Sequence, residues 1–140
     1  MKTGYLLLAT LFCLQIISCK SGDIYKKDKD LSIIFGSGGG FTGATEQYEI
    51  NGKGSLIKVS LPGDTALLPS ISKSQREYLR QLVNSDSLSR ISYNTYANMT
   101  SFIYVKVKEK SVYSFHWNGD SKLLPAPLFA LDSFLNTLVK

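Results

Sequence analysis

The chain has few of the side chains that catalytic and metal sites need. Its 140 residues include one histidine, one tryptophan and two cysteines. Both cysteines, Cys13 and Cys19, lie near the N-terminus, so the rest of the chain has no thiol for a disulfide or a nucleophile. A zinc site needs several His, Cys or clustered carboxylate ligands, which this sequence does not supply. We therefore expect a protein without a metal or cofactor and without enzyme activity.

Other functional signatures are also missing. The single histidine, His116, alternates with Phe115 and Trp117 on a predicted strand, which predicts a solvated strand histidine, and no nucleophile-elbow pattern accompanies it. No pair of carboxylates has a spacing suited to glycoside chemistry. The formal net charge is only +5, and the basic residues are scattered along the chain, so we expect no binding to nucleic acid.

The N-terminus has the features of an export signal. Lys2 is followed by an apolar run of signal-peptide length, which is too short to span a membrane. The run ends in Ile16-Ile17-Ser18-Cys19, which resembles the bacterial lipobox. We expect 1–18 to be a lipoprotein signal peptide, Cys19 to carry lipid, and 19–30 to be a flexible tether. This predicts a membrane-anchored lipoprotein of the bacterial envelope, in the outer membrane. An ordinary signal peptide with a coincidental cysteine is the alternative.

A glycine-rich stretch follows the tether. Residues 31–35 are mostly apolar, and five glycines then occur within eight residues, at Gly36, Gly38, Gly39, Gly40 and Gly43. Glycine at this density indicates a backbone with positive φ or a close approach of another chain. A dinucleotide site would need a helix after the last glycine, but 45–50 has the pattern of a strand.

Two interpretations of this stretch remain open. It is either a bulge or wide turn between paired strands, or a loop that contacts a partner. The candidate binding residues of such a loop are Gly38, Gly39, Gly40, Phe41, Thr42 and Gly43. Phe41 is expected to pack into the core, because a lone aromatic residue on a predicted strand usually points inward. A Phe41 that faces the partner is the alternative.

The remaining pattern predicts an α+β fold. Strands are expected at 31–35, 45–50, 55–61, 101–108 and 112–117, with a hairpin turn at Asn51-Gly52. Pro62-Gly63-Asp64 is expected to end a strand, with a connection at 65–70 and a loop at 84–98. The result is one domain over 31–140: a single antiparallel sheet of four to five strands with two helices packed on one face, in the order βββαββα.

Two helices are expected from apolar stripes at spacings of three and four residues. The first spans 72–84 and begins with a capping box, either Ser72-x-x-Gln75 or Ser74-x-x-Glu77. The second begins near Pro127. The residues predicted to face the core are Tyr78, Leu79, Leu82 and Val83 in the first helix, and Leu128, Leu131, Phe134, Leu135 and Leu138 in the second.

This order of elements resembles the emfourin family, small inhibitors of thermolysin-like metallopeptidases. The resemblance covers about Leu31 to Val139 and is most specific at Gly39-Gly40-Phe41-x-Gly43. A Leu-rich helix, a hairpin with Tyr104 and Tyr113 on its two strands, and a proline-led last helix also contribute. The resemblance implies a non-enzymatic inhibitor that occludes the cleft of a secreted or periplasmic metallopeptidase.

A second function class remains open beside the first. The chain is alternatively an interaction or structural lipoprotein that binds another envelope protein or a glycan. Tyr93, Tyr96 and Tyr104 are then the candidate stacking residues, although tyrosine on a β surface is often simple packing.

Overall fold

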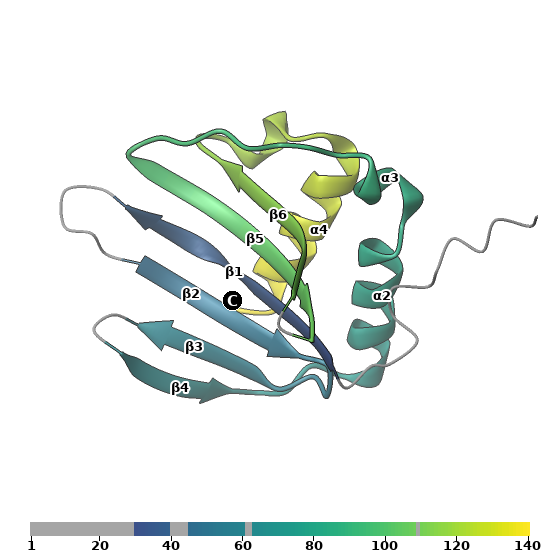
Figure 1. The fold of residues 1–140 in the computed structure, drawn as a ribbon. Coiled ribbons are helices and arrows are strands. Elements are labelled where there is room, and N and C mark those ends of the chain that lie inside the picture. Colours follow the sequence, from purple (N-terminus) through teal and green to yellow (C-terminus); the bar gives the residue numbers. More distant parts are fainter. Residues whose placement is uncertain (1–29, 40–44, 61–62, 109) are drawn as a thin grey trace, which may run out of the picture.

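The computed structural model describes residues 30–39, 45–60, 63–108 and 110–140. These residues form one six-stranded antiparallel sheet with the strand order β4-β3-β2-β1-β5-β6. The helices lie on one face of the sheet and leave the other face open (Figure 1). The strands are β1 Leu31–Gly39, β2 Thr45–Asn51, β3 Leu56–Ser60, β4 Asp64–Leu68, β5 Met99–Val107 and β6 Lys110–Trp117.

The predicted α+β class with a single antiparallel sheet is confirmed, but the predicted strand count and order are wrong. The sixth strand, β4, lies where 65–70 was expected to be a connection. Gly63 has a φ of 127°, and its N–H donates a 2.8 Å hydrogen bond to the Ser60 carbonyl. The chain therefore turns back at this point instead of leaving the sheet, and Leu68 pairs with Leu56. Within the described residues, four strands, not three, precede the helix that begins at Lys73.

Helix α2 spans Lys73–Val83 and begins at the first of the two predicted capping boxes. The Ser72 hydroxyl accepts a 3.2 Å hydrogen bond from the Gln75 N–H, and the Gln75 side chain accepts from the Ser72 N–H. Leu79 and Val83 are buried as predicted, and Leu82 is half-buried against the core. Tyr78 does not belong to the core. It is exposed, and its ring packs edge-on against Phe134.

The predicted loop at 84–98 contains a short helix, α3, over Asp86–Ser89. The Ser85 hydroxyl caps it by accepting a hydrogen bond from the Leu88 N–H, and the Leu88 side chain is fully buried. A brief 3₁₀ turn, η3, spans Ser121–Leu123. The loop prediction was wrong here because a cap and one apolar residue are enough to fix a single turn that periodicity does not detect.

Helix α4 spans Ala126–Thr137, with Pro127 in its first turn. Leu128, Leu131 and Leu135 are fully buried, while Phe134 and Leu138 are partly buried. These leucines join one core between the sheet and the helices. The sheet contributes Ile33, Phe35, Ile50, Leu56, Ile103, Val105, Phe115 and Trp117 to this core.

The predicted hairpin between β2 and β3 is present, but its turn has a different basis. The Asn51 side-chain oxygen accepts 3.0 Å hydrogen bonds from the N–H groups of Lys53 and Ser55. Positive φ occurs at Gly54, at 90°, and not at Asn51 or Gly52. Asn51 therefore acts through its side chain, as asparagine commonly does in turns.

Candidate functional site

The glycines at the start of the glycine-rich stretch belong to a central strand. Gly36, Gly38 and Gly39 continue β1, which pairs with β2 on one side and β5 on the other. The expected bulge or wide turn therefore does not begin at Gly36. The other candidate binding residues, Gly40, Phe41, Thr42 and Gly43, lie outside the described residues, so their roles stay predictions.

Close approach of neighbouring backbones explains two of these glycines. Gly36 has a φ of 155°, and a Cβ at this position would overlap the Glu46 carbonyl oxygen on β2. Gly39 has a φ of 114°, and a Cβ there would overlap the carbonyl oxygen of Asn98. The expectation of positive φ and close approach is confirmed at both positions. These glycines first serve the sheet, because the pairing of β1 depends on them.

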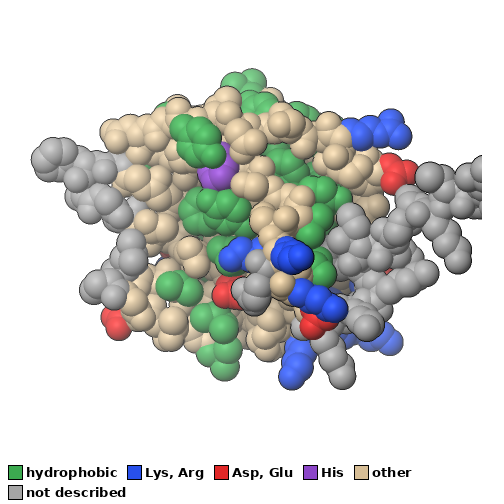
Figure 2. Space-filling view, in the orientation of Figure 1, with side chains coloured by type: hydrophobic (Ala, Val, Ile, Leu, Met, Phe, Trp, Pro, Cys, Tyr) green, Lys and Arg blue, Asp and Glu red, His purple; other side chains and the backbone are tan. Residues whose placement is uncertain are grey.

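An aromatic cluster lies on the open face of the sheet, beside this end of β1. We call Tyr96, Phe102, Tyr104 and His116 the open-face cluster. The ring centroids of Tyr96 and His116 are 4.7 Å apart, those of Tyr104 and His116 are 5.2 Å apart, and those of Phe102 and Tyr104 are 5.3 Å apart. Figure 2 shows hydrophobic side chains around the histidine on this face. Tyr96 is 71% exposed, yet its ring contacts the ring of His116.

The register places the glycines and the open-face cluster in one surface. Phe102 on β5 pairs with Gly36 on β1 and with His116 on β6. Gly38 lies two residues beyond Gly36, closer to the end of β1, and pairs with Thr100. Because Gly36 has no side chain, the sheet is flat on that side of Phe102. The candidate residues Gly38 and Gly39 therefore adjoin the open-face cluster.

The segment 93–95 lies beside β6 and is hydrogen bonded to the backbone of His116. The His116 N–H donates a 3.1 Å hydrogen bond to the Tyr93 carbonyl, and the Thr95 N–H donates a 2.9 Å bond to the His116 carbonyl. Asn94 and His116 form a parallel bridge. This pairing brings Tyr96 onto the histidine ring. Tyr93 is half-buried and packs against the core, so of the three predicted stacking residues only Tyr96 and Tyr104 belong to the cluster.

Both ring nitrogens of His116 have partners. The Tyr104 hydroxyl is hydrogen bonded to Nε2 at 2.7 Å, and the Tyr96 hydroxyl lies 3.2 Å from Nδ1. The Asn94 amide nitrogen fits best where it donates to Nδ1 at 3.0 Å and also reaches the carbonyls of Tyr93 and Ser114. Nδ1 is then an acceptor, and Nε2–H donates to Tyr104.

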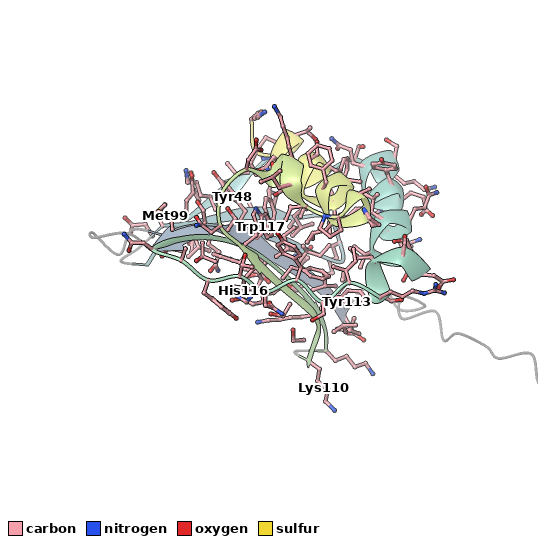
Figure 3. The ribbon with its side chains drawn as sticks, turned by 90° about the horizontal axis from the view of Figure 1, so that it is seen from above. Tyr48, Met99, Lys110, Tyr113, His116 and Trp117 are labelled. Atoms are coloured by element: carbon pink, nitrogen blue, oxygen red, sulfur yellow. The ribbon has the colours of Figure 1, made fainter. Side chains whose placement is uncertain are left out.

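His116 is therefore not the solvated histidine that the sequence predicted. It points away from the helices, as the alternation requires (Figure 3), but only 9% of it is exposed. The residues that cover it come from 93–96 and from β5, which a strand pattern does not reveal. Burial lowers the pKa of His116.

The lowered pKa of His116 predicts a pH-dependent stability. Above pH 6.5, the ordinary pKa of histidine, the ring is neutral in both the folded and the unfolded chain. As the pH falls below this value, the unfolded chain binds the proton more readily, so the free energy of unfolding should fall. Denaturant unfolding between about pH 7.5 and pH 5 measures this loss.

The chain has one histidine, so a variant provides a direct control. His116→Gln should remove this part of the pH dependence while lowering stability at neutral pH, because the bond to Tyr104 is lost. A free energy of unfolding that rises on acidification, or an equal decrease in both proteins, would contradict the burial of a neutral His116.

Among residues 30–39, 45–60, 63–108 and 110–140, no three His, Cys, Asp or Glu side chains gather where they could hold a metal ion. Within the same parts of the chain, no helix is long and apolar enough to cross a bilayer. The predicted lipid site, Cys19, lies outside the described residues. The ring contacts and hydrogen bonds of His116 make the open-face cluster the candidate functional site of the described residues.

Comparison with protein-family models and with curated proteins finds no match to this chain.

Proposed function

We propose that this chain is a non-enzymatic binding protein of the bacterial envelope that inhibits a thermolysin-like metallopeptidase by occluding its cleft. The contact surface is the open-face cluster together with the adjoining end of β1. One observation supports this choice of surface: the row Gly36–Phe102–His116 joins the cluster to the strand that leads into the candidate segment Gly38–Gly43.

The open-face cluster has the properties of a protein-binding surface. Tyrosine residues dominate binding energy at many interfaces because they bury a large area with few rotatable bonds. Here Tyr96 is exposed, yet His116 holds both its ring and its hydroxyl. A side chain ordered before binding loses less conformational entropy in a complex. The surface is thus prepared for a partner without a rearrangement of the sheet.

Binding suits this site better than catalysis does. A histidine that acts as a general base needs a nucleophile within hydrogen-bond reach. The partners of the His116 ring in the described parts of the chain are Asn94, Tyr96 and Tyr104, and no serine, threonine or cysteine side chain is among them. The ring therefore serves to position the tyrosines.

The first test replaces the exposed ring. Tyr96→Ala should weaken inhibition of a thermolysin-like metallopeptidase about tenfold, the effect of losing roughly 1.4 kcal/mol of interface energy. The inhibition constant is measured from hydrolysis of a peptide substrate with increasing amounts of the full chain. The melting temperature should change little, because Tyr96 is mostly exposed.

Leu67→Ala is the matched control for Tyr96→Ala. Leu67 is 77% exposed on β4, at the other end of the strand order from β6. It should leave the inhibition constant unchanged. Equal effects of the two variants, or the absence of inhibition by the unmodified chain, would contradict the proposed contact surface.

The membrane anchor is proposed from Ile16-Ile17-Ser18-Cys19. Cys19→Ala should abolish incorporation of labelled fatty acid and move the protein from the membrane fraction to the soluble fraction, because no residue would then accept the lipid. Acylation and fractionation of the expressed chain measure both effects. A Cys19→Ala protein that still carries the label at the membrane would exclude this anchor.

A second candidate function is favoured by the polar groups around the open-face cluster. The Tyr96 hydroxyl and the Asn94 amide both lie within hydrogen-bond distance of His116 Nδ1, and an exposed ring with neighbouring polar groups also suits a sugar. The ligand would then be an envelope glycan. Saturable binding of solubilised cell-wall glycan that Tyr96→Ala abolishes, without any protease inhibition, would favour this function.

A further inference from the structure

A cleft of about 270 Å³ lies on the helix side of the sheet, away from the open-face cluster. Its lining residues come from the sheet strands β1, β2, β5 and β6, from the turn after β6 and η3, and from the C-terminal half of α4 with Val139 just beyond it. Figure 3 shows Tyr48 and Trp117, both of which line it, on the helix side of the sheet. The cleft is therefore separate from the surface proposed above for the metallopeptidase.

Small residues on the sheet create this cleft. In one row across the sheet, Phe35, Ile103 and Phe115 pair side by side and fill the core beneath the helices. In the next row on this face, Ser37 pairs with Ser101, and Ser101 pairs with Trp117. Two serines in place of large apolar side chains leave space under α4, and this space carries hydroxyl groups.

One of the two carboxylates in the cleft already has a cation. The Glu46 carboxylate accepts hydrogen bonds from Lys58 Nζ at 2.5 Å and from the Tyr48 hydroxyl at 2.7 Å. The hydrogen bond from Lys58 is the main reason that the pKa of Glu46 is lowered. Glu46 is therefore ionised and neutralised within the fold.

The other carboxylate, Asp132 on α4, has no such partner. It is half-buried, and it accepts hydrogen bonds from the Asn136 amide, at 3.0 Å, and from Ser121. Among the residues that the structure describes, no lysine or arginine forms an ion pair with it. Burial raises the pKa of Asp132, since removing a carboxylate from water without a counter-ion is costly.

We propose that this cleft binds an aliphatic primary ammonium group with Asp132 as its counter-ion. An ammonium has three N–H donors and no acceptor. Asp132 accepts one of these donors, and the hydroxyl oxygens of Ser37 and Ser101 line the same space and accept the others. The apolar stem of the ligand lies against Trp117 and Val139. The ammonium comes either from a lysine side chain of a partner protein or from a small amine such as an amino sugar.

The charge and size of the cleft exclude other ligand classes. An anion would be repelled by the Asp132 carboxylate, and the ammonium of Lys58 is already engaged with Glu46. A drug-sized ligand needs roughly 300–1,000 Å³, so the cleft admits one short chain or one ring. A neutral alcohol of equal size would gain the hydroxyl contacts but not the charge pair, and this difference provides the test.

The experiment titrates the full chain with n-butylammonium and, separately, with n-butanol, while backbone amide shifts are followed by NMR at pH 7. Butylammonium should shift the amides of Ser37, Ser101 and Asn136 with an affinity at least fivefold higher than that of butanol. Asp132→Asn should remove this preference for the cation, whereas Asp86→Asn, at an exposed carboxylate on α3, should leave it unchanged.

Ser101→Leu is a second variant that fills the cleft without changing its charge. It should abolish binding of both probes while the amide shifts of Tyr96 and Tyr104 on the open face stay in place. Equal affinity for butylammonium and butanol, a cation preference that survives Asp132→Asn, or binding that survives Ser101→Leu would each overturn the proposal.

The source of the ammonium is determined with two larger probes. A short peptide with one lysine and free glucosamine are compared under the same conditions. Tighter binding of the peptide indicates a partner protein, and tighter binding of glucosamine indicates a saccharide. If neither probe binds and butylammonium causes no amide shifts, the proposed ammonium site is wrong. The metallopeptidase proposal would be unaffected, because it concerns the open face.

Discussion

Replacing Gly36 with alanine should lower the free energy of unfolding by roughly 2–6 kcal/mol. The backbone strain of a positive φ contributes about 1–3 kcal/mol, and overlap of the new Cβ with a neighbouring group contributes about another 1–3 kcal/mol. The overlapping group is the Glu46 carbonyl oxygen on β2. Since β1 is paired on both sides, it cannot move away from β2 without disturbing β5. Urea unfolding measures the loss.

Gly63→Ala is the control that separates strain from overlap. Gly63 has a φ of 127°, but no atom of the described residues lies within 4 Å of the position that its Cβ would occupy. This variant should lose only the strain contribution, about 1–3 kcal/mol. A Gly36→Ala protein that is as stable as Gly63→Ala would show that β1 is not held as closely between its neighbours as the structure indicates.

Replacing Leu131 with alanine should lower the free energy of unfolding by about 2–5 kcal/mol. Leu131 is fully buried in the middle of α4, where that helix packs on the sheet. The substitution removes apolar contacts and leaves a cavity that the fixed surroundings fill only in part. Chemical denaturation at pH 7 gives the difference directly, because alanine is a good helix former and does not weaken α4 itself.

Leu123→Ala is the matched control for Leu131→Ala. Leu123 lies in η3 and is 79% exposed, so the same substitution should change the free energy of unfolding by less than about 0.5 kcal/mol. If the two variants were equally stable, α4 would not form the core with the sheet. A half-buried position such as Leu82 should give an intermediate loss.

Local sequence patterns were sufficient for much of the fold. The Ser72–Gln75 capping box, the apolar stripe of α4 and the alternation in β5 and β6 depend on neighbours in the chain, so they could be predicted. Strand β4 could not be predicted. The local sequence around Gly63 is equally compatible with the end of the sheet segment and with a turn into another paired strand. Only the pairing with β3 distinguishes them, and this pairing is a tertiary interaction.

The candidate site was harder to predict than the fold. The glycine density predicted close approach of another backbone segment, and Gly36 and Gly39 show it. The same stretch did not indicate that β1 continues as far as Gly39. Tyr96 and Tyr104 were candidate stacking residues, yet nothing local connects them with His116. Their contact depends on the bridge between Asn94 and His116, which pairs residues that are far apart in the sequence. The cleft at Asp132 likewise needs strands, η3 and α4, which are far apart in the sequence.

The proposed contact surface is tested most directly by NMR cross-saturation from an unlabelled thermolysin-like metallopeptidase to the labelled full chain. Saturation should reach Tyr96, Thr100 and Phe102 at the end of the open sheet face, and it should leave the exposed side of α2 unaffected. Saturation concentrated on α2 or α4, or no transfer to the chain at all, would contradict binding through the open-face cluster.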